Sequence, residues 1–97
     1  MDNNNLNKAF RALRKAGYFA KQNFLCCQTC GWAAMTEEQA KKAVFYHAQD
    51  NDDKKDNRPF HLAWAGDGNE ICKILNANNV KTDWDGSDDK RICVISW

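Results

Sequence analysis

The stretch FHLAWAGDGNEICKIL, which spans residues 60–75, decides the fold of this chain. Over residues 60–65, large apolar side chains alternate with smaller or polar ones, which is the two-residue period of a β-strand with one buried face. Glycines at residues 66–68 then break the strand, and three aliphatic side chains recur at the spacing of one helical face over residues 71–75. These patterns predict a strand, a turn and a helix that ends near Asn79.

The sequence on either side of this stretch predicts two more helices and three more strands. The expected helices span residues 6–16, preceded by Asn3, Asn4 and Asn5 as caps, and residues 37–42; the expected strands span residues 44–47, 80–84 and 92–95. Thr36 and Gln39 have the spacing of a capping box at the start of the second helix. Residues 92–95 are apolar on both faces, so we expect this strand inside the sheet, after a hairpin signal at Asp85 and Gly86.

Two segments show no regular pattern. Residues 18–32 combine aromatic side chains with a cysteine-rich run, and we expect them to form a turn. Residues 49–58 contain no apolar side chain, and we expect a flexible loop there. The resulting order α-α-β-β-α-β-β predicts an α+β fold, with the helices packed on one face of a four-stranded, mostly antiparallel sheet.

Length and composition favour a single globular domain over residues 1–97. The chain has 97 residues, with 43% hydrophobic and 28% charged side chains, close to the average of soluble domains. Its formal charge of +1 lacks the basic excess typical of nucleic-acid-binding domains. The chain shows neither an apolar run of membrane-spanning length nor the apolar core of a signal peptide. Together with an odd number of cysteines, five, this predicts a cytoplasmic protein with reduced thiols.

Cys27 and Cys30 form the most distinctive local motif. Their C-x-x-C spacing allows both thiolates to bind one tetrahedral zinc ion, but it supplies only half of such a site. The remaining ligands would have to come from His47, His61, Cys72 and Cys93. Cys26 is not expected to join them, because neighbouring side chains in an extended segment point apart. Since no second pair of matching spacing exists, we expect no bound metal and no other cofactor.

The same cysteine pair is compatible with two kinds of catalysis. It would serve as a redox dithiol in a thioredoxin-type context, but the chain's one proline, Pro59, lies at the edge of a polar segment. Alternatively, one cysteine would act as a nucleophile, with His47 as its base and Asp50 orienting that base, in the chain order of papain-like hydrolases. A Cys-His enzyme, or a redox or zinc module, using Cys27, Cys30 and His47 is therefore the alternative to a binding role.

Surplus tryptophans favour a binding surface. Trp32 lies in the cysteine-rich turn and Trp97 at the end of the sequence, and tryptophan is enriched at protein interfaces. Gln49 and Asp50, in the expected loop, are further candidates for contacts with a partner. Four aspartates crowd residues 83–89, but they lack the ordered ligand positions of a calcium loop, and we expect them to form and solubilise the turn.

Four strings along the chain resemble an uncharacterised bacterial family, a domain of unknown function. They are CCQTCG at residues 26–31, HAQD at residues 47–50, WDG at residues 84–86 and RI at residues 91–92. The resemblance extends over residues 13–97 and departs from the family pattern at Ala48, Trp64 and Ala65. It implies one reusable domain and brings no established reaction, cofactor or partner. The positions that it marks are Cys26, Cys27, Cys30, Gly31, His47, Gln49, Asp50, Trp84, Asp85 and Gly86.

These observations predict a small cytoplasmic, non-enzymatic binding or regulatory module that acts on a protein partner. The sequence holds no complete catalytic constellation, and a core of this size leaves room only for shallow sites. The size also matches small inhibitors carried by phages or mobile elements. Neither nucleic acid nor a membrane is an expected partner.

Overall fold

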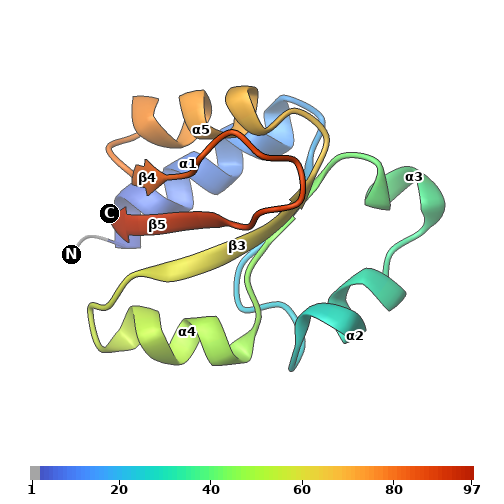
Figure 1. The fold of residues 1–97 in the computed structure, drawn as a ribbon, viewed down its shortest axis with the longest axis horizontal. Coiled ribbons are helices and arrows are strands. Elements are labelled where there is room, and N and C mark those ends of the chain that lie inside the picture. The colour runs from blue at the N-terminus through green and yellow to red at the C-terminus, as the bar shows by residue number, and fades with distance from the viewer. Residues whose placement is uncertain (1–2) are drawn as a thin grey trace.

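The structure, a computed structural model, describes residues 3–97, which form five helices and five strands (Figure 1). In chain order these are α1 (Asn3–Lys15), β1 (Phe19–Lys21), α2 (Gln28–Ala33), α3 (Glu37–Ala40), β2 (Ala43–Phe45), α4 (Ala48–Lys55), β3 (Phe60–Ala65), α5 (Gly68–Ala77), β4 (Lys81–Asp83) and β5 (Ile92–Ser96). The strands make one sheet in the order β1-β2-β3-β5-β4, in which β1 and β2 are parallel and the other pairs antiparallel. The α+β class, the mostly antiparallel sheet and the interior position of β5 are confirmed. The sheet has five strands instead of the four predicted, because the short β1 shows no alternating pattern.

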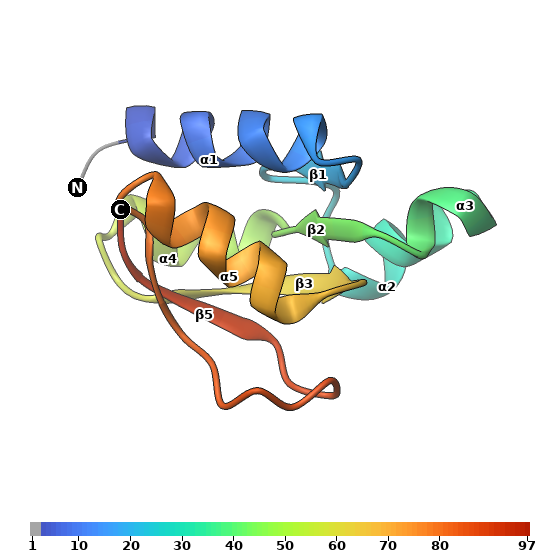
Figure 2. The same ribbon diagram turned by 90° about the horizontal axis from the view of Figure 1, so that it is seen from above.

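α1 and α5 lie side by side on one side of the sheet and build the main core (Figure 2). α1 turns its apolar stripe inward, so that Leu6, Phe10 and Leu13 are completely buried. α5 adds the buried side chains of Ile71 and Leu75. Burying each side chain of this kind contributes about 1.5–3 kcal/mol. The helical periodicity in the sequence places these side chains on one face of each helix. Their burial then holds both helices on the sheet.

α2 packs on the opposite side of the sheet, so the prediction that all helices share one face is wrong. Figure 1 shows α1 and α5 above β3 and β5, and α2 and α4 below them. Val44 of β2 joins the core under α1 and α5, whereas Phe45 contacts Gly31 and Trp32 of α2. All three residues of β2 are buried. A strand buried on both faces has no alternation, which is why its second covered face was not visible in the sequence.

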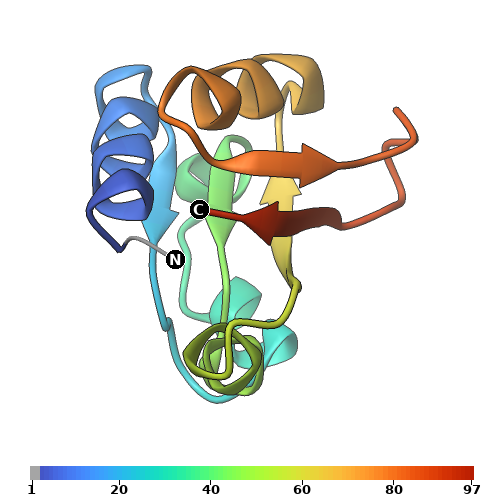
Figure 3. The ribbon, with the colours of Figure 1, turned by 90° about the vertical axis from the view of Figure 1, so that its left-hand side faces the viewer.

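Residues 48–55 form helix α4, where the sequence predicted a flexible loop. The helix contains two buried polar residues, Asp50 and Asn51. Asp50 pairs with the side chains of His47 and Arg91. Figure 3 shows α4 across the end of the sheet at which β2 ends and β3 begins. Polar tertiary contacts place this helix, so hydrophobic periodicity could not detect it.

The helix ends follow the local signals, with one exception. Thr36 and Gln39 form the predicted capping box at the start of α3. Asn79 adopts a left-handed conformation, with φ of 64°, just after α5, as expected. α1 begins at Asn3, so the three neighbouring asparagines form its first turn and do not precede it as caps.

Candidate functional site

Three thiols gather at the start of α2. Cys27 precedes the helix in an extended conformation, and its sulfur accepts the backbone N–H of Cys30 at 3.5 Å. The sulfur atoms of Cys26 and Cys30 are 3.5 Å apart. All three sulfur atoms lie within 4.8 Å of one another, and we call them the cysteine cluster. The prediction that Cys26 points away is wrong, because Asn23 and Leu25 adopt positive φ angles and turn the chain ahead of it.

The thiols of the cysteine cluster differ in acidity because they contact one another. The backbone N–H of Cys30 points at the sulfur of Cys27 and lowers the pKa of that thiol. Hydrogen bonds and charge repulsion from Cys27 and Cys26 raise the pKa of Cys30 to about 11. Cys72 and Cys93 lie outside the cluster, and burial raises the pKa of both. Of Cys27 and Cys30, Cys27 is therefore the one better prepared to exist as a thiolate.

A second cluster, of buried polar groups, joins α4 to β5. Nε2 of His47 lies 3.2 Å from Oδ2 of Asp50, and Nη2 of Arg91 lies 2.5 Å from the same oxygen. Arg91 also donates to the backbone carbonyl of His61 at 2.8 Å. The side chains of His47 and Asp50 are only 7% and 9% exposed. The buried carboxylate thus has two partners, and these contacts attach α4 to the start of β5.

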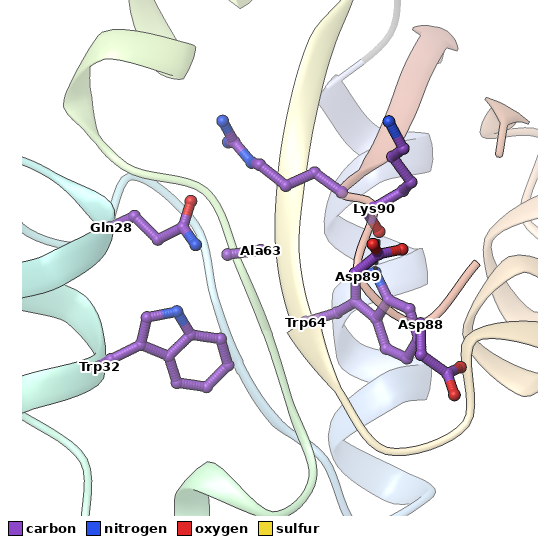
Figure 4. Close-up of a pocket in the computed structure, with 8 residues that line it drawn as sticks. Gln28, Trp32, Ala63, Trp64, Asp88, Asp89 and Lys90 are labelled. Carbon is purple, nitrogen blue, oxygen red and sulfur yellow. Dashed lines mark hydrogen bonds between the residues drawn. The ribbon is translucent and has the colours of Figure 1, made fainter. Parts of the chain in front are cut away.

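A pocket of about 150 Å³, here called the α2 pocket, opens between α2, β3 and the segment before β5. It is lined by Gln28, Trp32, Ala63, Trp64, Asp88, Asp89, Lys90 and Arg91. Figure 4 shows Gln28 and Trp32 on the α2 side of the pocket, with Asp88 and Asp89 across from them. The Trp64 indole N–H donates to the backbone carbonyl of Lys90 at 2.8 Å. This bond holds the segment with Asp88 and Asp89, here called the acidic wall, against β3.

A second pocket, of about 300 Å³, continues along the same segment. It is lined by His61, Asp83, Trp84, Asp85, Lys90, Arg91 and Cys93, so the two pockets share two basic residues. Asp85 accepts the backbone N–H of Ser87 at 2.9 Å, and this bond lowers the pKa of the carboxyl. Asp85 thus helps to form the turn, as the sequence predicted for the aspartates of this segment. Asp88 and Asp89 therefore line the α2 pocket, whereas Asp83 and Asp85 line this second pocket.

The structure brings together only part of the predicted catalytic set. His47 and Asp50 are in contact, as the Cys-His alternative requires. However, Nδ1 of His47 is buried without a hydrogen-bond partner in residues 3–97, so it forms no hydrogen bond with a cysteine sulfur. His47 is also absent from the cysteine cluster, so the ligand set of Cys27, Cys30 and His47 is not assembled. Cys26, and not His47, lies beside Cys27 and Cys30 as the third potential ligand.

The residues predicted to contact a partner divide into two pairs. Trp97 is only 6% exposed, because its ring packs against Phe60 with centroids 5.1 Å apart, so it offers little surface for the predicted contact with a partner. Asp50 is buried, and its carboxylate pairs with Arg91 within the molecule. Trp32 is half-buried and lines the α2 pocket, and Gln49 is exposed on α4.

Sequence reasoning assigned no role to Gln28 or Arg91 and set Cys26 aside. Gln28 and Arg91 are far apart in the sequence, and only the fold brings them to one pocket. All three residues lie within the CCQTCG and RI strings of the family resemblance. Those strings were therefore the one sequence signal that pointed to them.

Comparison with known proteins identifies the family. The family model described as "Domain of unknown function (DUF6891)" matches residues 1–97, and the chain belongs to this family. The expected membership of an uncharacterised family is thereby confirmed. No curated protein and no solved structure matched the chain. In residues 3–97, every helix is too short or too polar to cross a membrane.

Proposed function

We propose that this member of the DUF6891 family is a non-enzymatic binding module that holds a basic side chain of a protein partner in the α2 pocket. The observation that carries the proposal is the pairing of an aromatic wall with an acidic wall. Trp32 stands on one side of the pocket, and Asp88 and Asp89 stand on the other (Figure 4). A cation between them would gain both a cation–π contact and charge-assisted hydrogen bonds.

The charges of the acidic wall are free to pair with a ligand. Asp88 and Asp89 are exposed, and neither makes an ion pair within residues 3–97. Arg91 lines the same pocket, but Asp50 and the carbonyl of His61 already bind its guanidinium. Figure 4 shows the ammonium end of Lys90 directed away from the space between Trp32 and Asp88. The pocket therefore favours an incoming positive charge.

The size of the pocket favours a side chain of a larger partner over a free small molecule. Pockets for small ligands usually measure about 300–1,000 Å³ and bury most of the ligand, whereas the α2 pocket measures about 150 Å³. The neighbouring pocket of about 300 Å³ adds Asp83, Asp85 and Trp84 along the same segment. A basic segment of a protein would place successive side chains in the two pockets. An inhibitor acting on such a partner is the narrower form of this proposal.

The geometry does not favour the Cys-His enzyme. Such a reaction needs the base within hydrogen-bond reach of the nucleophile, about 2.6–3.2 Å for nitrogen or oxygen and slightly more for sulfur. Nδ1 of His47 makes no hydrogen bond within residues 3–97, and Nε2 is held by Asp50. His47 and Asp50 instead serve to fix α4, so the binding role remains the better-supported function.

Binding of defined peptides tests the proposal. Fluorescent peptides of equal length, one rich in Arg and Lys and one rich in Glu, are titrated with the purified chain. We expect the basic peptide to bind and to shift the NMR signal of the Trp32 indole N–H, and the acidic peptide to do neither. Higher salt should weaken the binding, because these charges are exposed.

Matched variants assign the binding to the pocket. Replacing Asp88 and Asp89 together by Asn should weaken binding of the basic peptide about tenfold or more, as should Trp32→Ala. Asp52→Asn, on the exposed surface of α4, is the control and should have no effect. Equal losses in the control, or full binding by the Asp88/Asp89 variant, would contradict the proposal.

A further inference from the structure

We propose that Cys26, Cys27 and Cys30 form a three-thiolate site that binds one thiophilic cation of the zinc type and leaves one coordination position open. This site is separate from the α2 pocket and does not depend on the proposed function. It also changes the ligand set considered from the sequence, since Cys26 replaces His47. Residues 3–97 contain this single group of three or more potential ligands, so the fourth ligand would be water or a group from a partner.

The distances between the sulfur atoms suit one tetrahedral ion. Thiolates about 2.3 Å from zinc in a tetrahedron lie about 3.8 Å apart. The sulfurs of Cys26 and Cys30 are 3.5 Å apart, and the three sulfurs lie within 4.8 Å of one another. An ion placed among them therefore requires movements of less than about 1 Å, which rotation of exposed side chains can supply.

The backbone holds Cys27 in place before any ion arrives. Cys27 precedes α2 with φ of −158° and ψ of 169°, and the N–H of Cys30 donates to its sulfur at 3.5 Å. A backbone N–H directed at a thiolate stabilises the negative charge and orients the ligand. Cys30 lies one turn further along α2, so two of the three ligands belong to one small rigid unit.

The charges explain why the cluster favours a cation. Three thiolates whose sulfur atoms lie within 4.8 Å of one another repel one another when all three are charged. A divalent ion would offset most of the combined charge and allow all three groups to lose their protons. Oxidation would remove the repulsion for two of the thiolates only, because a disulfide joins two of the sulfurs and leaves the third without a partner.

Metal titration of the full chain under reducing conditions tests the site. Zn²⁺ is added in competition with a chromogenic chelator, and Co²⁺ serves as a spectroscopic probe for thiolate ligands. We expect one Zn²⁺ per chain, and with Co²⁺ a charge-transfer absorption typical of sulfur ligands. If the reduced chain binds no Zn²⁺ at this stoichiometry, the proposal is wrong.

Serine variants identify the ligands. Cys26→Ser, Cys27→Ser and Cys30→Ser should each weaken Zn²⁺ binding about tenfold or more. Cys72→Ser and Cys93→Ser remove thiols outside the cluster, and these control variants should bind Zn²⁺ like the unchanged chain. Far-UV circular dichroism verifies that each variant is folded. Unchanged binding by Cys26→Ser would show a two-thiolate site and overturn the proposal.

Discussion

The side of the sheet under α1 and α5 is built from completely buried apolar side chains, whereas the side under α2 combines one buried ring with polar and reactive groups. Leu6, Phe10 and Leu75 have no exposed surface on the first side. On the second side, Phe45 is buried against α2, while the cysteine cluster and the α2 pocket remain open to solvent. The first side therefore supplies most of the stability of the domain, and the second side carries the groups available for recognition.

The two sides are joined through shared strands, which fixes the recognition groups on a rigid base. β2 contributes Val44 to one side and Phe45 to the other. β5 contributes Ile92 to the core, and the residue before it, Arg91, lines the α2 pocket. A site on such strands keeps its geometry because the opposite face is fully packed. Changes on the first side should therefore affect the whole domain, and changes on the second side should act locally.

Phe10→Ala should give the largest loss, because it truncates the first side at its centre. Phe10 is completely buried, and its ring meets the ring of Tyr46 edge to face with centroids 5.9 Å apart. Removing the ring should lower the free energy of unfolding by about 3–5 kcal/mol. Urea denaturation followed by circular dichroism measures this loss. Arg11→Ala, at an exposed position of the same helix, is the control and should change stability by less than about 0.5 kcal/mol.

Asp50→Ala should give the second largest loss, because it separates the two elements that the buried polar cluster joins. The substitution leaves His47 buried and Arg91 without its carboxylate partner. Breaking a fully buried ion pair costs about 3–5 kcal/mol, and the partial exposure of Arg91 reduces the expected loss to about 2–3 kcal/mol. Chemical denaturation provides the value, and hydrogen exchange should show that α4 opens first. A loss no greater than that of Asp52→Ala, an exposed neighbour on α4, would mean that these contacts do not hold the helix.

The contrast between the two sides also explains how far the sequence predicts the fold. α1 and α5 each bury one face, and residues 60–62 of β3 alternate between buried and exposed, so periods of 3.6 and 2 residues are visible in the sequence. β1 and α2 have three and six residues, too few for a period to show. α4 is held by polar partners distant in sequence, and no local pattern records such contacts.

The candidate site follows the same division. Cys27 and Cys30 could be identified from their spacing, and His47 and Asp50 from their chain order, because each pair is local. Cys26 joins the cluster because the backbone turns before α2. The expectation that neighbouring side chains point apart holds only for an extended segment, so it failed here. Arg91 reaches Asp50 only through the pairing of β3 and β5, so its role required the three-dimensional structure.

Gly31→Ala should give the smallest loss and should test the packing of α2 directly. A Cβ atom at this position would lie 2.5 Å and 2.7 Å from two carbons of the Phe45 ring, which is closer than van der Waals contact allows. Overpacking of this kind costs about 1–3 kcal/mol, and the better helix propensity of alanine returns up to about 1 kcal/mol. We therefore expect a net loss of about 1–2 kcal/mol. Faster hydrogen exchange in α2, with α1 unchanged, should accompany it.

A double-mutant cycle with Phe45→Leu identifies the cause of that loss. The smaller side chain at position 45 makes room for the new methyl group, so Gly31→Ala should cost less in the Phe45→Leu background than in the unchanged chain. Thr29→Ala, at an exposed position of α2, changes helix propensity without this contact and should be neutral or slightly stabilising. If Gly31→Ala behaves like Thr29→Ala, α2 is not packed tightly on Phe45. The α2 side would then lack a rigid base.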